Sequence, residues 1–157
     1  MMSIEQGDAL PNSALVAADG SALALPAWGA GAPFILYFYP KDDTSGCTRE
    51  AQDFTALMPE FTALGVKILG ISKDPPAKHQ KFTAKYDLTV PLATDEDGAL
   101  MESLDVWVEK SMYGKKYMGI ERSTFLFDAG GKLVRAWRKV KVPGHAAEVL
   151  DAAKALG

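Results

Sequence analysis

Residues 34–39, Phe-Ile-Leu-Tyr-Phe-Tyr, form an uninterrupted apolar and aromatic run, and Pro40 follows them. A strand with one face in water alternates apolar and polar side chains, whereas a strand covered on both faces can be apolar throughout. Proline lacks the backbone N–H that a strand interior needs, so it ends the run. The run therefore predicts a central strand in a sheet that is covered on both faces.

Strand and helix patterns alternate along the rest of the chain. Asp19-Gly20, between residues 14–18 and 22–25, is typical of a short β-hairpin. An apolar stripe at i, i+3, i+4 and i+7 indicates a helix that begins near Cys47 and is closed by Gly65, with a kink or a restart at Pro59. We expect further strands at residues 66–71, 91–93, 124–127 and 133–137, and further helices from a cap at 72–76 to residue 86, near 98–104 and at about 144–156.

This alternation predicts an α/β fold with a central mixed β-sheet flanked by helices and an N-terminal β-hairpin. The chain has 157 residues and shows no internal repeat or linker, so we expect one domain that spans residues 1–157. A domain of this size buries enough apolar surface to fold without a metal or a cofactor, and we expect neither.

The charged residues argue against several classes of function. The 20 acidic and 17 basic residues give a net charge of -3 and form no block of like charge that could follow a phosphate backbone. The first residues lack the basic segment and apolar stretch of a signal peptide, and the longest strongly apolar run, residues 33–39, is too short to cross a bilayer. We therefore expect a soluble, cytoplasmic protein that binds neither nucleic acid nor membrane.

Cys47 is the only cysteine, and it follows a polar loop between the central strand and a helix. The unpaired N–H groups at the start of a helix stabilise a thiolate. A thiolate that attacked a peroxide would push negative charge onto the departing oxygen, which needs hydrogen-bond donors in place. The hydroxyl of Thr44 and the backbone N–H groups of Gly46 and Cys47 are candidate donors. Arg122 is a candidate for a fixed cation, and Pro40 is a candidate to shield the sulfur.

The spacing Pro40-x-x-x-Thr44-x-x-Cys47, followed by Arg122 within Ile-Glu-Arg-Ser-Thr-Phe, resembles the active-site signature of the peroxiredoxins. The surrounding residues 37–51 resemble the bacterioferritin comigratory protein branch, also called Q-type peroxiredoxins, and the resemblance covers nearly the whole chain. It implies a thioredoxin-like fold, a site of Cys47, Thr44, Pro40 and Arg122, and a protein that is often monomeric. It also implies a thiol-specific peroxidase that reduces hydrogen peroxide and organic hydroperoxides to water and alcohols through a Cys47 sulfenic acid.

The chain departs from that branch at two positions. Many members have proline where this chain has Ser45, a change that loosens the loop without removing a reactive group. Many also have a resolving cysteine five residues after the peroxidatic one, where this chain has Gln52. We therefore expect a one-cysteine mechanism in which an external thiol reductant, thioredoxin, glutaredoxin or glutathione, completes the cycle.

Other functions are compatible with a single thiol. A lone cysteine is most often a buried structural residue, and the motif is what favours chemistry over that interpretation. A redox sensor would be oxidised once and then stop, and a scaffold or chaperone would keep its activity without Cys47. An acyl-transfer enzyme that paired Cys47 with His145 would need an orienting partner, which the sequence does not supply.

The remaining polar and aromatic residues have simpler interpretations. His79 and His145 are expected to be solvated, and with one cysteine they provide no metal-ligand spacing. Glu50 is a candidate for a hydrogen-bond network with an arginine, but it stays outside the catalytic set, because an acidic residue near a helix start is explained by the helix dipole. The aromatic residues, Tyr113 among them, are expected to pack the core or to line the site entrance.

Overall fold

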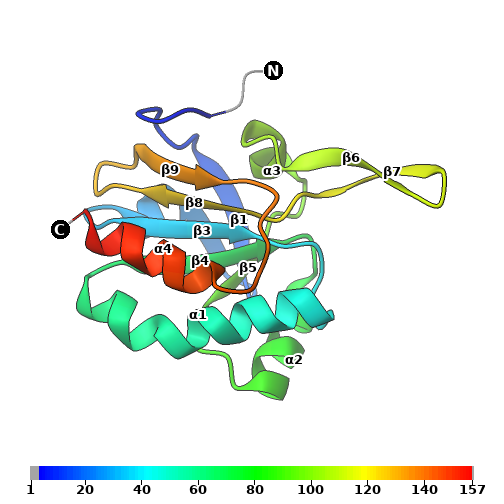
Figure 1. The fold of residues 1–157 in the computed structure, drawn as a ribbon, viewed down its shortest axis with the longest axis horizontal. Coiled ribbons are helices and arrows are strands. Elements are labelled where there is room, and N and C mark those ends of the chain that lie inside the picture. Colours follow the sequence, from blue (N-terminus) through cyan, green and yellow to red (C-terminus); the bar gives the residue numbers. More distant parts are fainter. Residues whose placement is uncertain (1–3, 157) are drawn as a thin grey trace.

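The computed structural model describes residues 4–156, and Figure 1 shows a central sheet with helices packed against it. Seven strands form this sheet in the order β2-β1-β5-β4-β3-β8-β9. They are β1 Ser13–Ala17, β2 Ala22–Leu25, β3 Phe34–Phe38, β4 Lys67–Ser72, β5 Leu92–Thr94, β8 Ser123–Phe127 and β9 Leu133–Trp137. A second sheet consists of β6 Trp107–Met112 and β7 Lys115–Ile120. The helices are α1 Ser45–Ala63, α2 Pro76–Tyr86, α3 Ala99–Ser103, α4 His145–Lys154 and the short 3-10 helix η1 Ala27–Gly29.

Strand β3 is the central strand that the apolar run predicts. It pairs in parallel with β4 and antiparallel with β8, and all five of its residues are buried. Ile35 and Tyr37 belong to one core, to which α1, α2 and α4 contribute, whereas Phe34, Leu36 and Phe38 belong to a second core that includes residues of α3. The prediction of a mixed sheet with helices on both faces is therefore confirmed.

The other predicted elements are present, with ends that differ by one or two residues. The N-terminal hairpin pairs Ala14 with Ala24, and Gly65 follows α1 with a φ of +73°, a conformation that favours glycine. Pro59 causes no restart, since α1 is one helix from Ser45 to Ala63. Phe54 and Phe61, on either side of the proline, are buried in the same core. This packing outweighs the loss of one backbone hydrogen bond.

Strands β6 and β7 form a hairpin that the sequence patterns do not predict. Strand β6 has no buried residue and β7 has only Ile120, so they lack the alternation by which a half-buried strand is recognised. Their turn is Tyr113-Gly114, and both residues have a positive φ, 52° and 78°, as a two-residue type I′ turn requires. Tyr113 is 98% exposed at this turn, so it does not pack the core.

Helix α1 is 19 residues long. A helix crosses a bilayer only when about 20 consecutive residues are predominantly apolar. Arg49, Glu50 and Asp53 interrupt any such run in α1. Across residues 4–156, no helix combines the length and the apolar character that a membrane span needs.

Gly70 lies in β4 against the buried ring of Tyr37. A β-carbon at position 70 would lie 2.6 Å from Cζ of Tyr37 and 2.8 Å from Cδ2 of Leu92. We predict that Gly70→Ala lowers the free energy of unfolding by about 1–3 kcal/mol, because the core must shift to accept the methyl group. Urea denaturation measures this change. The control is Gly130→Ala, whose β-carbon would meet only Oδ1 of Asp128, at 3.4 Å; equal losses in the two variants would contradict the prediction.

Candidate active site

Helix α1 begins just after the loop that leaves β3 (Figure 1), and Cys47 lies in its first turn. The first hydrogen bond of the helix runs from the N–H of Thr48 to the carbonyl of Thr44, at 2.8 Å. The N–H groups of Ser45, Gly46 and Cys47 therefore have no acceptor within the helix. Together with the helix dipole, they create a positive potential around the sulfur. Cys47 is 2% exposed, so water has little access to it.

Arg122 contacts the sulfur from a position 75 residues further along the chain. It immediately precedes β8, whose antiparallel register with β3 pairs Ser123 with Phe38. Arg122 is thereby placed beside the end of β3. Its Nη2 donates a hydrogen bond to Sγ of Cys47 at 3.1 Å, and its Nη1 donates one to Oε1 of Glu50 at 2.6 Å. The structure thus brings the predicted cation to the predicted nucleophile.

Glu50 belongs to this cluster, although the sequence pattern did not select it. It follows Cys47 by three residues, so the two side chains lie on one face of α1. The Glu50 side chain is 1% exposed. Burial raises the pKa of Glu50 to about 7, although the neighbouring Arg122 opposes the rise. Glu50 can therefore gain or lose a proton near neutral pH.

Arg122 remains a cation over the same pH range. Its burial alone would lower its pKa, but the charges of Glu50 and Cys47 and the hydrogen bonds to both outweigh burial and raise it. A guanidinium group has its donors in a planar fork, so one side of Arg122 can hold Glu50 while the other side holds the sulfur. The signal that could have revealed Glu50 is its spacing of three residues from Cys47.

The Thr44 hydroxyl makes its hydrogen bond within the loop between β3 and α1. Its Oγ1 donates a hydrogen bond to the carbonyl of Lys41 at 2.9 Å, and a hydroxyl has only one hydrogen to donate. In this conformation the hydroxyl hydrogen is in use, and the oxygen lone pairs of Thr44 can accept a further hydrogen bond. Thr44 is exposed and is the N-cap residue of α1.

Gly46 and Pro40 lie on either side of Thr44 in the chain. A β-carbon at position 46 would lie 3.2 Å from Nη2 of Arg122, so the absence of a side chain leaves room for the guanidinium group beside Cys47. Pro40 is exposed where the loop leaves β3. The structure therefore gives a steric reason for glycine at position 46, and it places Pro40 at the surface.

The loop between β3 and α1 is anchored from inside by Asp42. This residue is buried, its Oδ2 lies 2.7 Å from Nδ1 of His79 on α2, and its Oδ1 accepts a short hydrogen bond from the hydroxyl of Tyr39. The other ring nitrogen of His79, Nε2, lies 3.1 Å from the carbonyl oxygen of Ala93. A carbonyl can only accept, so Nε2 carries a hydrogen. His79 is fully buried, and the expectation that it is solvated is wrong.

A second set of contacts ties the same loop to α2 at the surface. Asp43 accepts hydrogen bonds from Nζ of Lys85 at 2.8 Å and from the hydroxyl of Tyr86 at 2.6 Å. The backbone N–H of Asp42 donates to Oδ2 of Asp74, at 2.8 Å, just before α2. The loop that carries Thr44 is therefore held to α2 at two points and to the segment just before α2 at a third.

His145 is also buried, so the expectation that it is solvated is wrong. Its ring meets the rings of Phe54 and Trp137 edge-on, with centroids 6.2 and 5.8 Å away, and its Nε2 lies 2.8 Å from Oγ1 of Thr124. Burial lowers the pKa of His145 to about 4, so the ring is neutral at pH 7. Within residues 4–156, no group of three or more His, Cys, Asp or Glu side chains is arranged to hold a metal ion.

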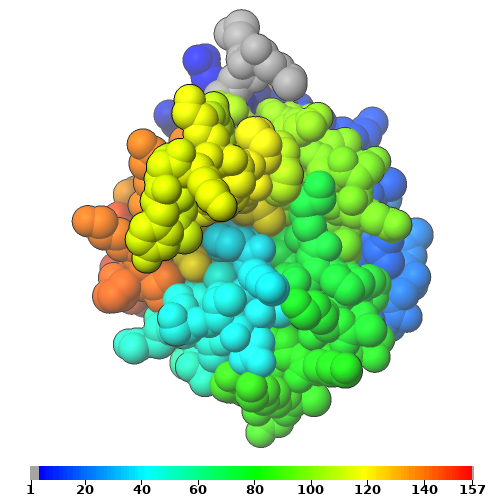
Figure 2. All heavy atoms as spheres, turned by 90° about the vertical axis from the view of Figure 1, so that its right-hand side faces the viewer, coloured from blue at the N-terminus to red at the C-terminus, as the bar shows by residue number. Residues whose placement is uncertain are grey.

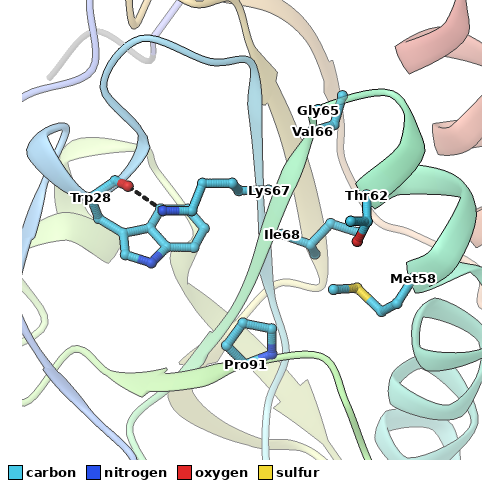
Figure 3. A pocket seen from close by; sticks show the side chains of 8 residues that line it. All are labelled: Trp28, Met58, Thr62, Gly65, Val66, Lys67, Ile68 and Pro91. Carbon is cyan, nitrogen blue, oxygen red and sulfur yellow. Dashed lines mark hydrogen bonds between the residues drawn. The ribbon is translucent and has the colours of Figure 1, made fainter.

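A cavity of about 300 Å³ lies at the opposite end of α1 from Cys47 (Figure 3). Its walls include Met58 and Thr62 of α1. Lys67 also lines it, with Nζ 2.5 Å from the carbonyl oxygen of Trp28 and 4.3 Å from the centre of the Trp28 ring. The helix between Cys47 and Thr62 measures about 22 Å. The cavity is therefore separate from the cysteine.

Comparison with known proteins identifies relatives along most of the chain. Residues 6–136 match the model of the AhpC/TSA family. Peroxiredoxin Bcp of Xanthomonas campestris is 56% identical over 126 residues, which cover 80% of this chain and 79% of that protein. Peroxiredoxin Bcp of Bacillus subtilis is 46% identical over 153 residues, which cover 98% of this chain and 97% of that protein.

Solved structures of similar proteins share the fold. Peroxiredoxin Q of Xanthomonas campestris superposes with a TM-score of 0.88 at 49% identity, over 97% of this chain and 96% of that one. A cysteine-to-serine mutant of PrxQ from Xylella fastidiosa superposes with a TM-score of 0.92 at 40% identity, over 99% of this chain and 98% of that one. These similarities confirm the predicted thioredoxin-like fold.

A thioredoxin-like sheet with an arginine-bound cysteine at the start of a helix defines a thiol peroxidase. The chain belongs to the AhpC/TSA family, in its bacterioferritin comigratory protein or Q-type peroxiredoxin branch. It is accordingly an oxidoreductase that reduces peroxide with electrons from a thiol. Its single cysteine is consistent with the predicted one-cysteine mechanism.

Glu50→Gln should change how stability depends on pH. In the unfolded chain Glu50 ionises near its ordinary pKa of 4.5, whereas in the folded chain it keeps its proton up to about pH 7. The unfolded state binds fewer protons in this window, so the free energy of unfolding of the wild type falls as pH rises from about 4.5 to 7, by about 3 kcal/mol. Glutamine does not titrate. Urea denaturation of both proteins across pH 4.5–8 should therefore show this relative loss in the wild type, and a constant difference would refute it.

Proposed function

We propose that this chain reduces hydrogen peroxide and organic hydroperoxides to water and alcohols, with Cys47 as nucleophile and with Thr44, Gly46, Arg122 and Pro40 completing the catalytic set. The hydrogen bond of 3.1 Å from Arg122 to the sulfur carries the proposal. A cation bonded to the sulfur favours the thiolate over the thiol. The same cation is in place when negative charge develops on the departing oxygen.

The oxidative step is a displacement on oxygen. The Cys47 thiolate attacks one peroxide oxygen, the S–O bond forms as the O–O bond breaks, and the electron pair of the O–O bond leaves with the second oxygen. That oxygen takes up a proton and departs as water or an alcohol, while the sulfur is oxidised to a sulfenic acid. The N–H groups of Gly46 and Cys47 and the guanidinium of Arg122 are the donors available to the developing charge.

Thr44 orients the peroxide in this proposal. Its hydrogen is donated to the carbonyl of Lys41, so its oxygen is free to accept the hydrogen of the peroxide hydroxyl. Accepting that hydrogen bond turns the attacked oxygen toward Cys47, which lies one helical turn away. Pro40 contributes as the rigid start of the loop that positions Thr44.

The reductive step requires a second molecule. Solved structures of the Xanthomonas campestris protein include serine mutants of two cysteines that lie 36 positions apart, whereas Cys47 is the only cysteine of this chain, so neither Gln52 nor any later residue can act as an internal resolving cysteine. An external thiol condenses with the sulfenic acid to give a mixed disulfide and water, and a further thiol releases the Cys47 thiolate. We propose thioredoxin, glutaredoxin or glutathione as that thiol, and a monomer that acts in the cytoplasm.

Arg122→Met should slow the oxidation of Cys47 by hydrogen peroxide by about 10- to 100-fold, because a charge-assisted hydrogen bond contributes about 1.5–3 kcal/mol. Cys47→Ser should abolish peroxide consumption. Stopped-flow mixing of reduced protein with peroxide measures both. Arg49→Met, an exposed arginine on α1 that pairs with Asp53 at 3.0 Å, is the matched control and should keep the wild-type rate. Equal rates for wild type and Cys47→Ser would overturn the proposed peroxidase function.

The choice of reductant can be read from sustained turnover. Wild-type protein with excess peroxide should consume it continuously when thioredoxin, glutaredoxin with glutathione, or dithiothreitol is supplied, since each provides two thiols per cycle. Without a thiol, consumption should stop after one equivalent. A protein that stopped after one equivalent with every thiol would instead be a redox sensor, and activity that survived Cys47→Ser would indicate a scaffold or chaperone.

A further inference from the structure

The hairpin of β6 and β7 projects from the body of the molecule (Figure 1), and Figure 2 shows it beside the segment around residues 40–50 that contains Cys47. It carries four large apolar side chains on its surface: Met112, Tyr113, Tyr117 and Met118 are 56%, 98%, 44% and 50% exposed. Only one other large apolar side chain in the described part of the chain is comparably exposed, Leu64 at the far end of α1. Apolar side chains gathered in this way on one element mark an interaction surface.

The register of the hairpin sorts its exposed residues onto two faces. Met112 pairs with Lys115 and Lys110 pairs with Tyr117, and residues directly opposite each other in a ladder lie on the same face. These four residues, Lys110, Met112, Lys115 and Tyr117, form what we call the basic-apolar face. Lys110 and Tyr117 approach each other over Gly119, where a β-carbon would lie 3.2 Å from one and 3.4 Å from the other.

The opposite face of the hairpin is neutralised. There Glu109 forms an ion pair with Lys116 at 3.7 Å and lies opposite Met118. Within residues 4–156, neither Lys110 nor Lys115 has a carboxylate within ion-pair distance. The chain as a whole has a net charge of -3, so the two free lysines stand out as local positive charges. A partner that complements this face presents apolar groups flanked by carboxylates.

The hairpin is continuous with the catalytic cluster. Strand β7 ends at Ile120, two residues before Arg122, whose guanidinium contacts Cys47. Each strand has six residues and so extends about 20 Å. Cys47 is only 2% exposed. A protein that brings a thiol into bonding distance of this sulfur must cover the surrounding surface, and a stable protein contact covers about 800 Å² per partner.

We propose that the basic-apolar face docks the protein thiol that reduces Cys47, a partner whose reactive cysteine is bordered by apolar and acidic residues. This inference rests on the proposed peroxidase function and adds to it that the reductant is a protein held by the hairpin. A small thiol needs no such surface, because it can reach the sulfur through a narrow opening. The docked thiolate attacks the Cys47 sulfenic acid, forming the mixed disulfide and releasing water, and a second thiol of the partner then frees Cys47.

The test compares reduction by proteins with reduction by a small thiol. The variant Met112→Ser/Tyr117→Ser removes both apolar side chains of the face, and Leu64→Ser removes an exposed apolar side chain far from it. In the double variant, kcat/KM for thioredoxin or glutaredoxin should fall at least tenfold, since an apolar anchor at an interface typically contributes more than 1 kcal/mol. Turnover with dithiothreitol, and the rate at which peroxide oxidises Cys47, should stay at the wild-type value in both variants.

The other outcomes overturn the docking proposal in distinct ways. Equal loss with dithiothreitol and with the proteins would show that the hairpin acts on Cys47 itself. If the double variant kept the wild-type kcat/KM for both thioredoxin and glutaredoxin, the face would dock no protein thiol. The same conclusion would follow if glutathione reduced the wild type and neither protein did. A wild-type dimer that the double variant converts to monomers would identify a second copy of the chain as the occupant. In each case the wild type still consumes peroxide, whereas a wild type that consumes none refutes the peroxidase function instead.

Charge reversal provides an independent measurement. Lys110→Glu/Lys115→Glu should lower the association rate with an acidic partner and reverse its dependence on salt, because exposed charges act mainly on the rate of encounter. The control is Lys116→Glu, which changes a lysine that already has a carboxylate partner on the opposite face. If the two variants had the same effect on thioredoxin or glutaredoxin, the proposed face would be wrong.

Discussion

The contact of Arg122 with both Cys47 and Glu50 depends on the pairing of two strands. Ser123 lies opposite Phe38 in the β3–β8 ladder, and Arg122 therefore lies where β3 gives way to the loop that leads to Cys47. A shift of β8 by one residue would turn its side chains to the other face of the sheet and break both hydrogen bonds of Arg122. The hydrophobic cores on both faces of β3 oppose that shift. The reactive end of the molecule thus takes its geometry from the centre of the sheet.

The loop between β3 and α1 shows how polar groups can be used inside a core. Burying Asp42 beside His79 costs desolvation free energy, which their close contact recovers only in part. What the pair supplies is position, since it holds the loop to α2 at a defined point. Glu50 is buried in the same way against Arg122. The site is therefore built from buried pairs of titratable side chains whose arrangement is specific and whose contribution to stability is small or negative.

The elements that could be predicted are those whose side chains are buried in a regular pattern or that belong to a local sequence motif. Residues 34–39 are apolar throughout because both faces of β3 are covered. Cys47 belongs to a motif that spans only a few neighbouring residues. The contact between Arg122 and the sulfur could be expected only from the family resemblance, because a separation of 75 residues carries no local signal. The burial of His79 and His145 could not be predicted because their partners, Asp42 and Thr124, are distant in sequence. Strands β6 and β7 bury only Ile120 fully, at one end of the hairpin, which is too little to produce a pattern.

Because the chain has a single cysteine, oxidation and reduction place different demands on its surface. Oxidation by a small peroxide suits a sulfur that is 2% exposed and held by a guanidinium group, because the substrate is small enough to reach it. Reduction has the opposite requirement, since the thiol arrives on another molecule. Because residues 40–44 are tied to α2 and to the segment just before it at three points, the loop resists moving aside for that molecule. The partner must instead bind to what already lies outside the site, and the hairpin that leads into Arg122 is the exposed element next to it.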